Sequence, residues 1–260
     1  MKVGLFPFDA RESDREGNLR QVTRAAEGAA SSGARLLVLP ELWASGYDLA
    51  AARREEDWSR EISAVTKLSR EHQLAIIGSL LLPHSDTARP PSNCAFAFDG
   101  GRELGRYSKS HLFAPLREHE FLSAGKELPI PFEIDQVRVA MAICYDLRFP
   151  ELFRPAAIDG VDLWCVCAQW PRARIEQWRA LLIARAIESQ AFVIGVNRCG
   201  AMGETVFGGN ALLIDPRGAV LFNSEESPEL AFVEFDPSEA RRWREEFPAL
   251  RDRRGDLYAP

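Results

Sequence analysis

Three reactive side chains each follow an apolar run that favours a β-strand. Glu41 ends the run LLVLPE, Lys109 lies in YSKSHLF, and Cys144 lies in VRVAMAICYDLRFPEL. Residues just after a strand are held by rigid elements and are presented to a crevice at the sheet edge. A thiol, a carboxyl and an ammonium group at such positions could supply the nucleophile, the proton carrier and the oxyanion donor that acyl transfer needs.

Each of these side chains also has an ordinary structural interpretation. A single glutamate that closes a strand usually faces solvent, and a single loop lysine such as Lys109 is usually solvated. Glu41, however, follows Pro40, which restricts the backbone, and precedes Trp43 and Tyr47. We therefore expect a partly apolar wall that favours the protonated carboxyl and suits a proton carrier. The apolar residues after Lys109 likewise predict a wall rather than an open loop.

The stretch around Cys144 favours a strand, a turn and then a helix. The apolar run ends in a polar turn that contains Asp146 and Arg148, and Pro150 is typical of the first turn of a helix. A buried inert thiol is the alternative, because free cysteine is among the most buried residue types. The polarity of the turn leads us instead to expect an exposed thiol that nearby cations hold as the thiolate.

The remaining cysteines and the histidines do not form a recognised metal motif. The five cysteines and four histidines include no CxxC pair and no HExxH, so we expect no metal. An odd number of cysteines without an export signal favours the reducing cytoplasm over a disulfide framework. Cys165 and Cys167 alternate with apolar residues in one run, and we interpret both as core.

Length and charge predict one globular domain that binds neither nucleic acid nor membrane. The 260 residues can bury a sizeable core, so we expect a single domain over residues 1–260 with an extended C-terminal arm at about 247–260. The net charge of -6 is spread along the chain, and no Lys/Arg-rich run interleaved with aromatics occurs. The apolar start is too short for a signal peptide, and no stretch reaches the length of a membrane span. Phosphate-binding glycine loops are missing too, which leaves no sign of a nucleotide cofactor.

Short apolar runs alternate with amphipathic stretches, which is the pattern of an α/β fold. Helices are expected over 18–32, 51–72, 150–159 and 175–189. Strands are expected over 3–8, 35–39, 74–81, 93–98, 103–107, 137–143, 163–167, 192–197, 211–214, 219–222 and 231–235. A tight glycine turn at Asp99-Gly100-Gly101 pairs two of these strands antiparallel, so the sheets are mixed. So many strands need two sheets, and their apolar faces predict a four-layer α-β-β-α sandwich.

Five segments together resemble the nitrilase superfamily of carbon-nitrogen hydrolases: PELWASGYD, YSKSHLF, ICYDLRFPEL, ARAIESQAFV and IDPRGAV. The resemblance is specific and covers essentially the whole chain. It implies the four-layer fold and a Glu-Lys-Cys triad, with Cys144 as nucleophile, Glu41 as general base and later acid, and Lys109 stabilising the tetrahedral intermediate. The second glutamate of the family, which precedes a glycine-containing segment, falls on Glu118, with Glu120 as the alternative.

The chemistry of amide hydrolysis agrees with these implied roles. Cys144 would attack the amide carbon while Glu41 receives the thiol proton and passes it to the leaving ammonia. Water would then hydrolyse the thioester, again with Glu41 as base. Lys109 and the backbone N–H of Tyr145 would hold the oxyanion, a contact commonly worth about 3 kcal/mol of barrier. No metal or organic cofactor is required.

Within that superfamily, CYDLRF and the ending RDRRGDLYAP resemble the omega-amidase and deaminated-glutathione amidase branch. This implies an amide that bears a carboxylate, and we expect 2-oxoglutaramate or 2-oxosuccinamate, with deaminated glutathione as the nearest rival. A carboxylate calls for a fixed cation, which Arg174 offers beside the aromatic wall of Trp170. Arg172 is the alternative, Tyr47 matches a substrate-lining tyrosine, and we interpret Arg148 as structural and paired with a buried acid. The chain departs from the family's Gly-x-Ser at 208–210, which concerns the local substrate loop and not the triad.

Two other classes of function make different predictions. A Cys-His hydrolase would pair Cys144 with His111 or His119, so replacing Glu41 would have little effect. A silent binding module on the same fold would lack one member of the triad, and all three are present. The resemblance also implies at least a homodimer that pairs across a helical face beside the Cys144 turn.

Overall fold

The computed structural model describes residues 1–49, 57–84 and 89–258, and its centre consists of two six-stranded sheets. In the first sheet the strand order is β14 (Ala231–Glu234), β1 (Lys2–Leu5), β2 (Leu36–Val38), β3 (Ala75–Leu82), β4 (Ser92–Asp99) and β5 (Arg102–Ser108). In the second it is β6 (Phe132–Ile134), β7 (Val137–Ile143), β8 (Leu163–Ala168), β9 (Phe192–Asn197), β12 (Ala211–Ile214) and β13 (Val220–Asn223). Each sheet has parallel pairs at its centre and antiparallel pairs toward both edges, so both are mixed as predicted.

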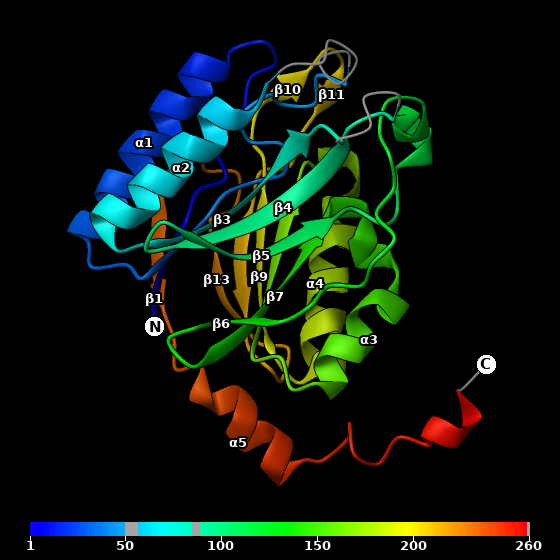
Figure 1. Cartoon of the computed structure of the whole chain (residues 1–260). Helices are drawn as coiled ribbons and strands as arrows, with labels where there is room; N and C mark the ends of the chain where they lie inside the picture. Colours follow the sequence, from blue (N-terminus) through cyan, green and yellow to red (C-terminus); the bar gives the residue numbers. More distant parts are fainter. Residues whose placement is uncertain (50–56, 85–88, 259–260) are drawn as a thin grey trace.

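Helices cover the outer faces of the two sheets (Figure 1). Helices α1 (Arg15–Ser31) and α2 (Ser59–His72) lie on the first sheet, and α3 (Pro150–Ile158) and α4 (Ile175–Ser189) lie on the second. Helix α4 can approach β9 closely because Gly195 has no side chain; a Cβ there would lie 2.6 Å from a methyl group of Leu182. The result is the predicted four-layer α-β-β-α sandwich.

The strands are apolar on both faces because each face is buried in a different layer. On β2, Leu36 and Val38 belong to the core between the two sheets, whereas Leu37 belongs to the core under the helices. Successive side chains of a strand point to opposite faces, so this alternation separates two apolar layers. Cys165 and Cys167 on β8 are completely buried, which confirms their interpretation as core.

Several element boundaries differ from the predicted ones. The helix expected over 51–72 begins at Ser59, and residues 51–56 lie outside the described part of the chain. The strand expected over 3–8 ends at Leu5. Helix α1 starts three residues early because the side chain of Asp14 accepts the N–H of Gly17 and caps it. Elements that the apolar pattern did not reveal are β6, the small hairpin β10 (Ala201–Met202) with β11 (Thr205–Val206), and α5 (Ser238–Glu246).

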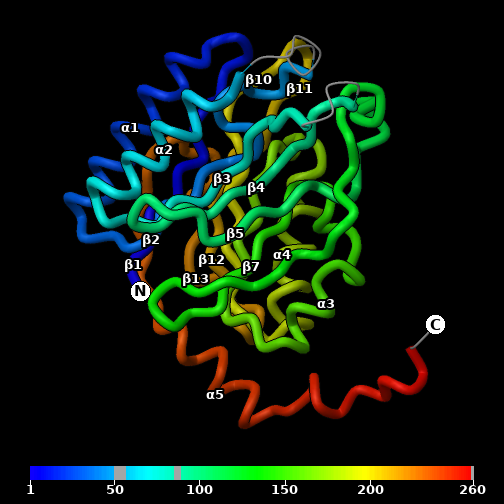
Figure 2. The backbone as a smooth tube through the Cα atoms, viewed as in Figure 1, coloured from blue at the N-terminus to red at the C-terminus, as the bar shows by residue number. Residues whose placement is uncertain are grey.

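Helix α5 docks mainly through charge, which explains why its sequence lacks an apolar stripe. Arg241 and Arg244 donate to the fully buried carboxylate of Asp162 at 2.7 and 2.6 Å, and Ala240 is the buried residue of the helix. Beyond it, the chain runs along the outside of the molecule, away from the two sheets (Figures 1 and 2). No helix in the described ranges is long and apolar enough to cross a membrane.

The strand ends of both sheets meet at one place. Glu41 lies shortly after β2, Lys109 directly after β5, Cys144 directly after β7 and Gln169 directly after β8. The sheets therefore bring together the three side chains identified from the sequence.

Candidate active site

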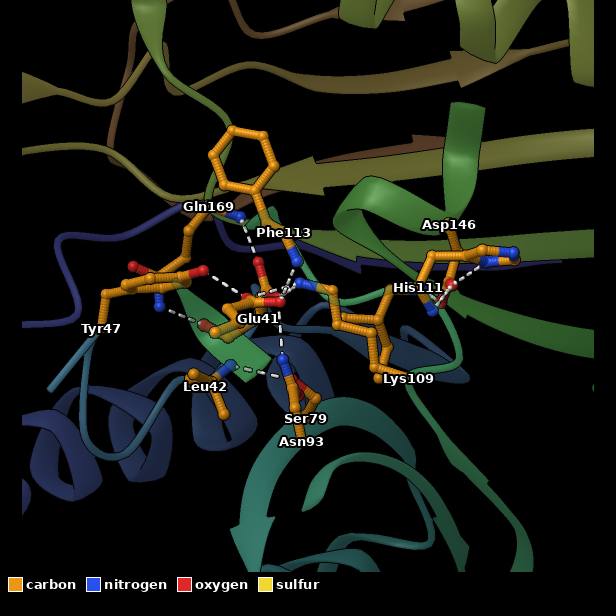
Figure 3. A network of polar contacts seen from close by, with 12 residues as sticks. Glu41, Leu42, Tyr47, Ser79, Asn93, Lys109, His111, Phe113, Asp146 and Gln169 are labelled. Atoms are coloured by element: carbon orange, nitrogen blue, oxygen red, sulfur yellow. Dashed lines mark hydrogen bonds and ion pairs between the residues drawn. The ribbon is translucent and has the colours of Figure 1, made fainter. Parts of the chain in front are cut away.

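A buried cluster of charges lies where the strand ends meet (Figure 3). The Nζ atom of Lys109 lies 2.8 Å from Oε1 of Glu41 and 2.8 Å from Oε1 of Glu118, and all three side chains are shielded from solvent. A buried ammonium group is tolerated when it is paired and hydrogen-bonded, which two carboxylates achieve here. Two of the three N–H donors of Lys109 are used in these contacts, so one donor remains for another group.

The two carboxylate oxygens of Glu41 are bound unequally. Oε1 accepts hydrogen bonds from Asn93 Nδ2 at 2.7 Å and from Lys109 at 2.8 Å. Oε2 accepts the backbone N–H of Gln169 at 2.9 Å, and the side-chain amide of Gln169 donates to the carbonyl of Glu41 at 2.8 Å. Oε1 is therefore saturated, whereas Oε2 keeps a lone pair that can accept a proton.

Cys144 lies directly after β7 and beside the Glu41 carboxyl. Its backbone has a φ of 46°, a left-handed conformation uncommon for a non-glycine residue, and it starts the short 3-10 helix η4 (Cys144–Arg148). A contact with the thiol lowers the pKa of the Glu41 carboxyl, and a contact with the Gln169 backbone lowers that of the Cys144 thiol. Only 8% of Cys144 is exposed, so the predicted exposed turn is wrong.

Burial and neighbouring charges decide the proton affinities in the cluster. Burial raises the pKa of the Cys144 thiol well above its usual range, and Glu41 adds to this more than Lys109 offsets it. Burial also raises the pKa of Glu41, although Lys109 opposes the change. Burial alone would lower the pKa of Lys109, but Glu118 and Glu41 outweigh it and hold that pKa well above its ordinary value. These directions favour a neutral thiol at rest over the expected thiolate, so a base has to take its proton.

Glu118, and not Glu120, lies in the cluster. The Glu118 carboxylate binds Lys109 and the hydroxyl of Tyr47 through Oε1, and its Oε2 accepts the backbone N–H of Phe113 at 2.5 Å. Glu120 instead pairs with an exposed arginine at 2.7 Å. Tyr47 is buried, and its hydroxyl donates to Glu118. The hydrogen bonds from Tyr47 and from the Phe113 N–H together fix the Glu118 carboxylate, which in turn orients Lys109.

A third buried carboxylate of the site, Asp146, joins the loops that carry Lys109 and Cys144. Its oxygens accept the N–H of Ile143, the hydroxyl of Tyr107 and both the N–H and Nδ1 of His111, at 2.8 to 3.2 Å. The sequence suggested only that Asp146 made the turn polar. The signal available was its position two residues after Cys144, just as His111 stands two residues after Lys109.

The two histidines are not placed as partners of the Cys144 thiol. His111 is bonded to Asp146, and its ring stacks on Phe149 with 3.7 Å between centroids. His119 is exposed beside Glu120. This geometry favours Glu41, which contacts the thiol directly, as the base.

Aromatic and cationic groups line the side of the site near α4. Trp170 is buried, donates its indole N–H to the carbonyl of Arg174 at 3.0 Å and packs on Trp178. The exposed guanidinium of Arg174 lies 5.8 Å from the ring centre of Phe113, and no acidic residue in the described part of the chain pairs with it. Arg172 instead forms an ion pair with Glu226.

Arg148 does not pair with a buried acid, so that interpretation is wrong. Its guanidinium lies over Trp170 at 4.9 Å and donates to the side-chain oxygen of Gln177 at 2.6 Å. The buried acid nearest to it in the sequence, Asp146, instead accepts hydrogen bonds from Ile143, Tyr107 and His111. Arg148 therefore packs against the aromatic wall as a half-buried cation.

Residues 208–210, which depart from the family's Gly-x-Ser pattern, pack against the segment that carries Trp170. The N–H of Gly208 donates to the carbonyl of Trp170 at 3.1 Å, and a Cβ at Gly208 would lie 2.6 Å from Ile175. Asn210, where the family pattern has serine, adopts a φ of 74° and donates to Asn223 at 3.0 Å. The residues that depart from the family pattern are therefore buried and contact the segment of Trp170.

Comparisons with known proteins agree with this geometry. The family model for carbon-nitrogen hydrolases matches residues 3–245. A Staphylococcus aureus protein described as "Hydrolase in agr operon" is 35% identical over 99% of this chain and all of its own length. The 2-oxoglutaramate amidase of Bacillus subtilis (strain 168) is 38% identical over 98% of both chains. A solved variant of the amidase from Nesterenkonia sp. AN1, in which acrylamide has added to the active-site cysteine, superimposes with a TM-score of 0.88 at 27% identity, over 99% of this chain and 98% of that one.

Proposed function

The chain belongs to the carbon-nitrogen hydrolase family, and from this premise we propose that it is an omega-amidase. Its substrates are the amides 2-oxoglutaramate and 2-oxosuccinamate, which it hydrolyses to the 2-oxo-dicarboxylate and ammonia. The observation that carries the proposal is the buried cluster in which Glu41, Lys109 and Glu118 meet beside the Cys144 thiol. The Bacillus relative, named for the first of these reactions, supports the choice of substrate.

The reaction begins when Glu41 takes the proton of the Cys144 thiol. Oε2 is the accepting atom, because Oε1 already has two donors and Oε2 has one, the N–H of Gln169. That N–H bonds to the sulfur as well, so one donor lies against both reacting atoms. The sulfur then attacks the amide carbon, and the carbonyl π-electrons move to oxygen.

Two N–H donors stabilise the oxyanion of the tetrahedral intermediate. One is the remaining N–H of Lys109, and the other is the backbone N–H of Tyr145, which lies in the first turn of η4 and has no carbonyl partner within that helix. Each such donor is commonly worth about 3 kcal/mol of barrier. When the carbonyl re-forms, the C–N bond breaks, Glu41 gives its proton to the leaving nitrogen, and ammonia departs from the thioester.

Hydrolysis of the thioester uses the same groups in reverse. Water attacks the acyl carbon while Glu41 takes its proton, the C–S bond breaks, and the proton returns to Cys144. Glu118 and Tyr47 act on this cycle through Lys109, whose ammonium group they keep charged and directed at the reacting carbonyl. The products are the free acid and an enzyme ready for another substrate.

Arg174 recognises the substrate carboxylate, and its replacement tests this role. R174Q is expected to raise KM for 2-oxoglutaramate by about 10- to 100-fold, because a hydrogen bond to a charged group contributes roughly 1.5–3 kcal/mol. The matched control is R172Q. In the wild type the Arg172 guanidinium is paired with Glu226, so its replacement should leave KM close to that of the wild type. Steady-state kinetics decide between them: a large rise in R172Q alone would assign the carboxylate to Arg172.

Deaminated glutathione amidase activity is the alternative on the same site. Trp170 and Trp178 are buried and pack on each other with 5.6 Å between ring centroids, which supports a wall that excludes a tripeptide. The deciding experiment measures the 2-oxo acid formed from 2-oxoglutaramate, 2-oxosuccinamate and deaminated glutathione. Turnover of the first two is expected, and turnover of deaminated glutathione alone would overturn the assignment.

A homodimer that pairs across α3 and α4 is part of the proposal. Ile158 on α3 and Ile187 on α4 are 51% and 50% exposed, which supports an apolar contact face on these two helices. We expect sedimentation velocity at micromolar concentration to give a dimer and I187E to shift it toward monomer. A clean 29.1 kDa monomer for the wild type would contradict this. A reducing cytoplasm, which keeps the free cysteines reduced, is the proposed location.

A further inference from the structure

Arg198 is a completely buried charge that the steps above do not use. It follows β9, and its guanidinium lies over the ring of Phe207 at 4.6 Å. It donates to the carboxylates of Glu12 and Asp9 and, at 2.8 Å, to the side-chain oxygen of Gln169. A buried guanidinium is strongly unfavourable unless it is paired and hydrogen-bonded. The fold therefore provides this one with partners from several segments.

These partners belong to both sheets. Asp9 and Glu12 follow β1 of the first sheet, whereas Gln169 and Arg198 follow β8 and β9 of the second. Glu12 also accepts the backbone N–H of Tyr47 at 3.1 Å, which brings in the segment after β2. Arg198 thus joins the segments that follow β1 and β8 to its own segment after β9, and Glu12 extends the connection to the segment after β2.

Gln169 continues this connection to Glu41. A guanidinium has donors only, so Arg198 keeps the side-chain oxygen of Gln169 on its own side and turns the amide nitrogen toward the Glu41 carbonyl. This sets the place of the Gln169 backbone N–H, which donates to Oε2 of Glu41. We propose that Arg198 is a positioning residue that, through Gln169, keeps Oε2 of Glu41 facing the Cys144 sulfur. The inference rests on the proposed role of Glu41 as proton carrier.

Loss of this positioning should change proton affinities and not only stability. Lys109, Glu118 and Cys144 act on the pKa of Glu41, and Glu41 in turn raises the pKa values of Tyr47 and Cys167. The Gln169 N–H donates to both Oε2 and the sulfur, and a donor to a charged form lowers the pKa of that group. If the N–H moves away, the pKa values of Glu41 and Cys144 both rise, so the thiol becomes reactive only at higher pH.

Two variants that conserve charge test the connection. R198K keeps the positive charge but loses the fork that reaches Glu12 and Gln169 together, and Q169M removes the amide without adding charge. The measurement is the pH at which alkylation of Cys144 by iodoacetamide reaches half its maximal rate, with the modified cysteine identified by peptide mass. Both variants are expected to raise this midpoint by about one pH unit and to lower kcat for 2-oxoglutaramate about tenfold at neutral pH, with KM close to that of the wild type.

The matched control is R244K, which perturbs another buried ion pair. Arg244 donates to Asp162 beyond the opposite end of β8, so R244K should lower the melting temperature and leave the alkylation midpoint unchanged. A folded R198K with the wild-type midpoint would overturn the proposal. Should R198K fail to fold, an unchanged midpoint in Q169M would overturn it, because the connection passes through that amide.

The two readouts separate this inference from the proposed function. Raised midpoints in R198K and Q169M together with a wild type that hydrolyses no 2-oxo amide would support the positioning role and refute the omega-amidase assignment. If the wild type hydrolyses the 2-oxo amides normally and both variants keep the wild-type midpoint and kcat, the omega-amidase assignment is supported and the positioning role is refuted.

Discussion

Replacing Cys144 with alanine is expected to lower kcat for 2-oxoglutaramate by on the order of 10⁴- to 10⁶-fold, to the residual rate that binding and the oxyanion donors alone support. The sulfur forms the thioester, and nothing else at the site can replace it. The other four cysteines are buried and free, and burial raises the pKa of Cys165 on β8 far above the working range. The measurement is formation of the 2-oxo acid by purified, folded C144A.

The matched control for this loss is Cys165→Ala. Cys165 lies in the apolar core two residues from Cys167, so its truncation should lower the melting temperature through a small cavity. Turnover per folded molecule should be unchanged. Hydrolysis by C144A at a rate near that of the wild type would refute the thioester route, whatever the control does.

Replacing Glu41 with glutamine should lower kcat by about 10²- to 10⁴-fold, because an amide cannot accept the thiol proton. The change also removes a pH effect. Burial raises the pKa of Glu41, so the wild-type kcat/KM should fall as the pH drops through that raised value and the carboxylate becomes protonated. This acid limb should be missing from the residual activity of E41Q. A pH profile of kcat/KM for both enzymes is the measurement.

Glu120→Gln is the control for Glu41→Gln, because Glu120 lies outside the cluster and pairs with an exposed arginine. E120Q should retain the wild-type rate and pH profile. The result that would contradict the role of Glu41 is an E41Q variant with near wild-type activity together with an inactive His111→Ala variant. That result would favour a Cys-His mechanism over the Glu41 mechanism.

The positions of Glu41, Lys109 and Cys144 could be predicted because they follow from local pattern. Glu41 and Cys144 come after apolar runs and Lys109 after a strand of a predicted hairpin, and strand ends of packed sheets converge at one edge. The family resemblance added Glu118, whose place depends on a loop with no apolar period. Glu41, Lys109 and Cys144 are therefore the part of the site that local pattern predicts, and Glu118 is the part that the resemblance adds.

The residues that hold this site in place could not be predicted, because their contacts connect distant segments. Gln169 bonds to Glu41 across 128 positions, and Arg198 bonds to Glu12 across 186. In the sequence, Gln169 and Arg198 are ordinary polar residues after two strands. Only the pairing of the sheets brings them together.

The wrong prediction of an exposed thiol has the same origin. Polar residues after Cys144 suggested a turn open to solvent. Asp146 instead turns inward, because it can satisfy the buried N–H and O–H donors of Ile143, His111 and Tyr107. The turn is therefore buried, and this burial raises the pKa of the Cys144 thiol, which is why a base is required.

The most direct test of the thioester mechanism is partitioning by hydroxylamine. 2-Oxoglutaramate and the corresponding methyl ester are each hydrolysed by the wild type in the presence of hydroxylamine, and the ratio of hydroxamate to acid is measured. We predict the same ratio from both substrates, because both form one acyl group on Cys144, together with an acylated Cys144 peptide after acid quench. Different ratios, with no acylated Cys144 peptide at any time, would contradict a common thioester and the role of Cys144.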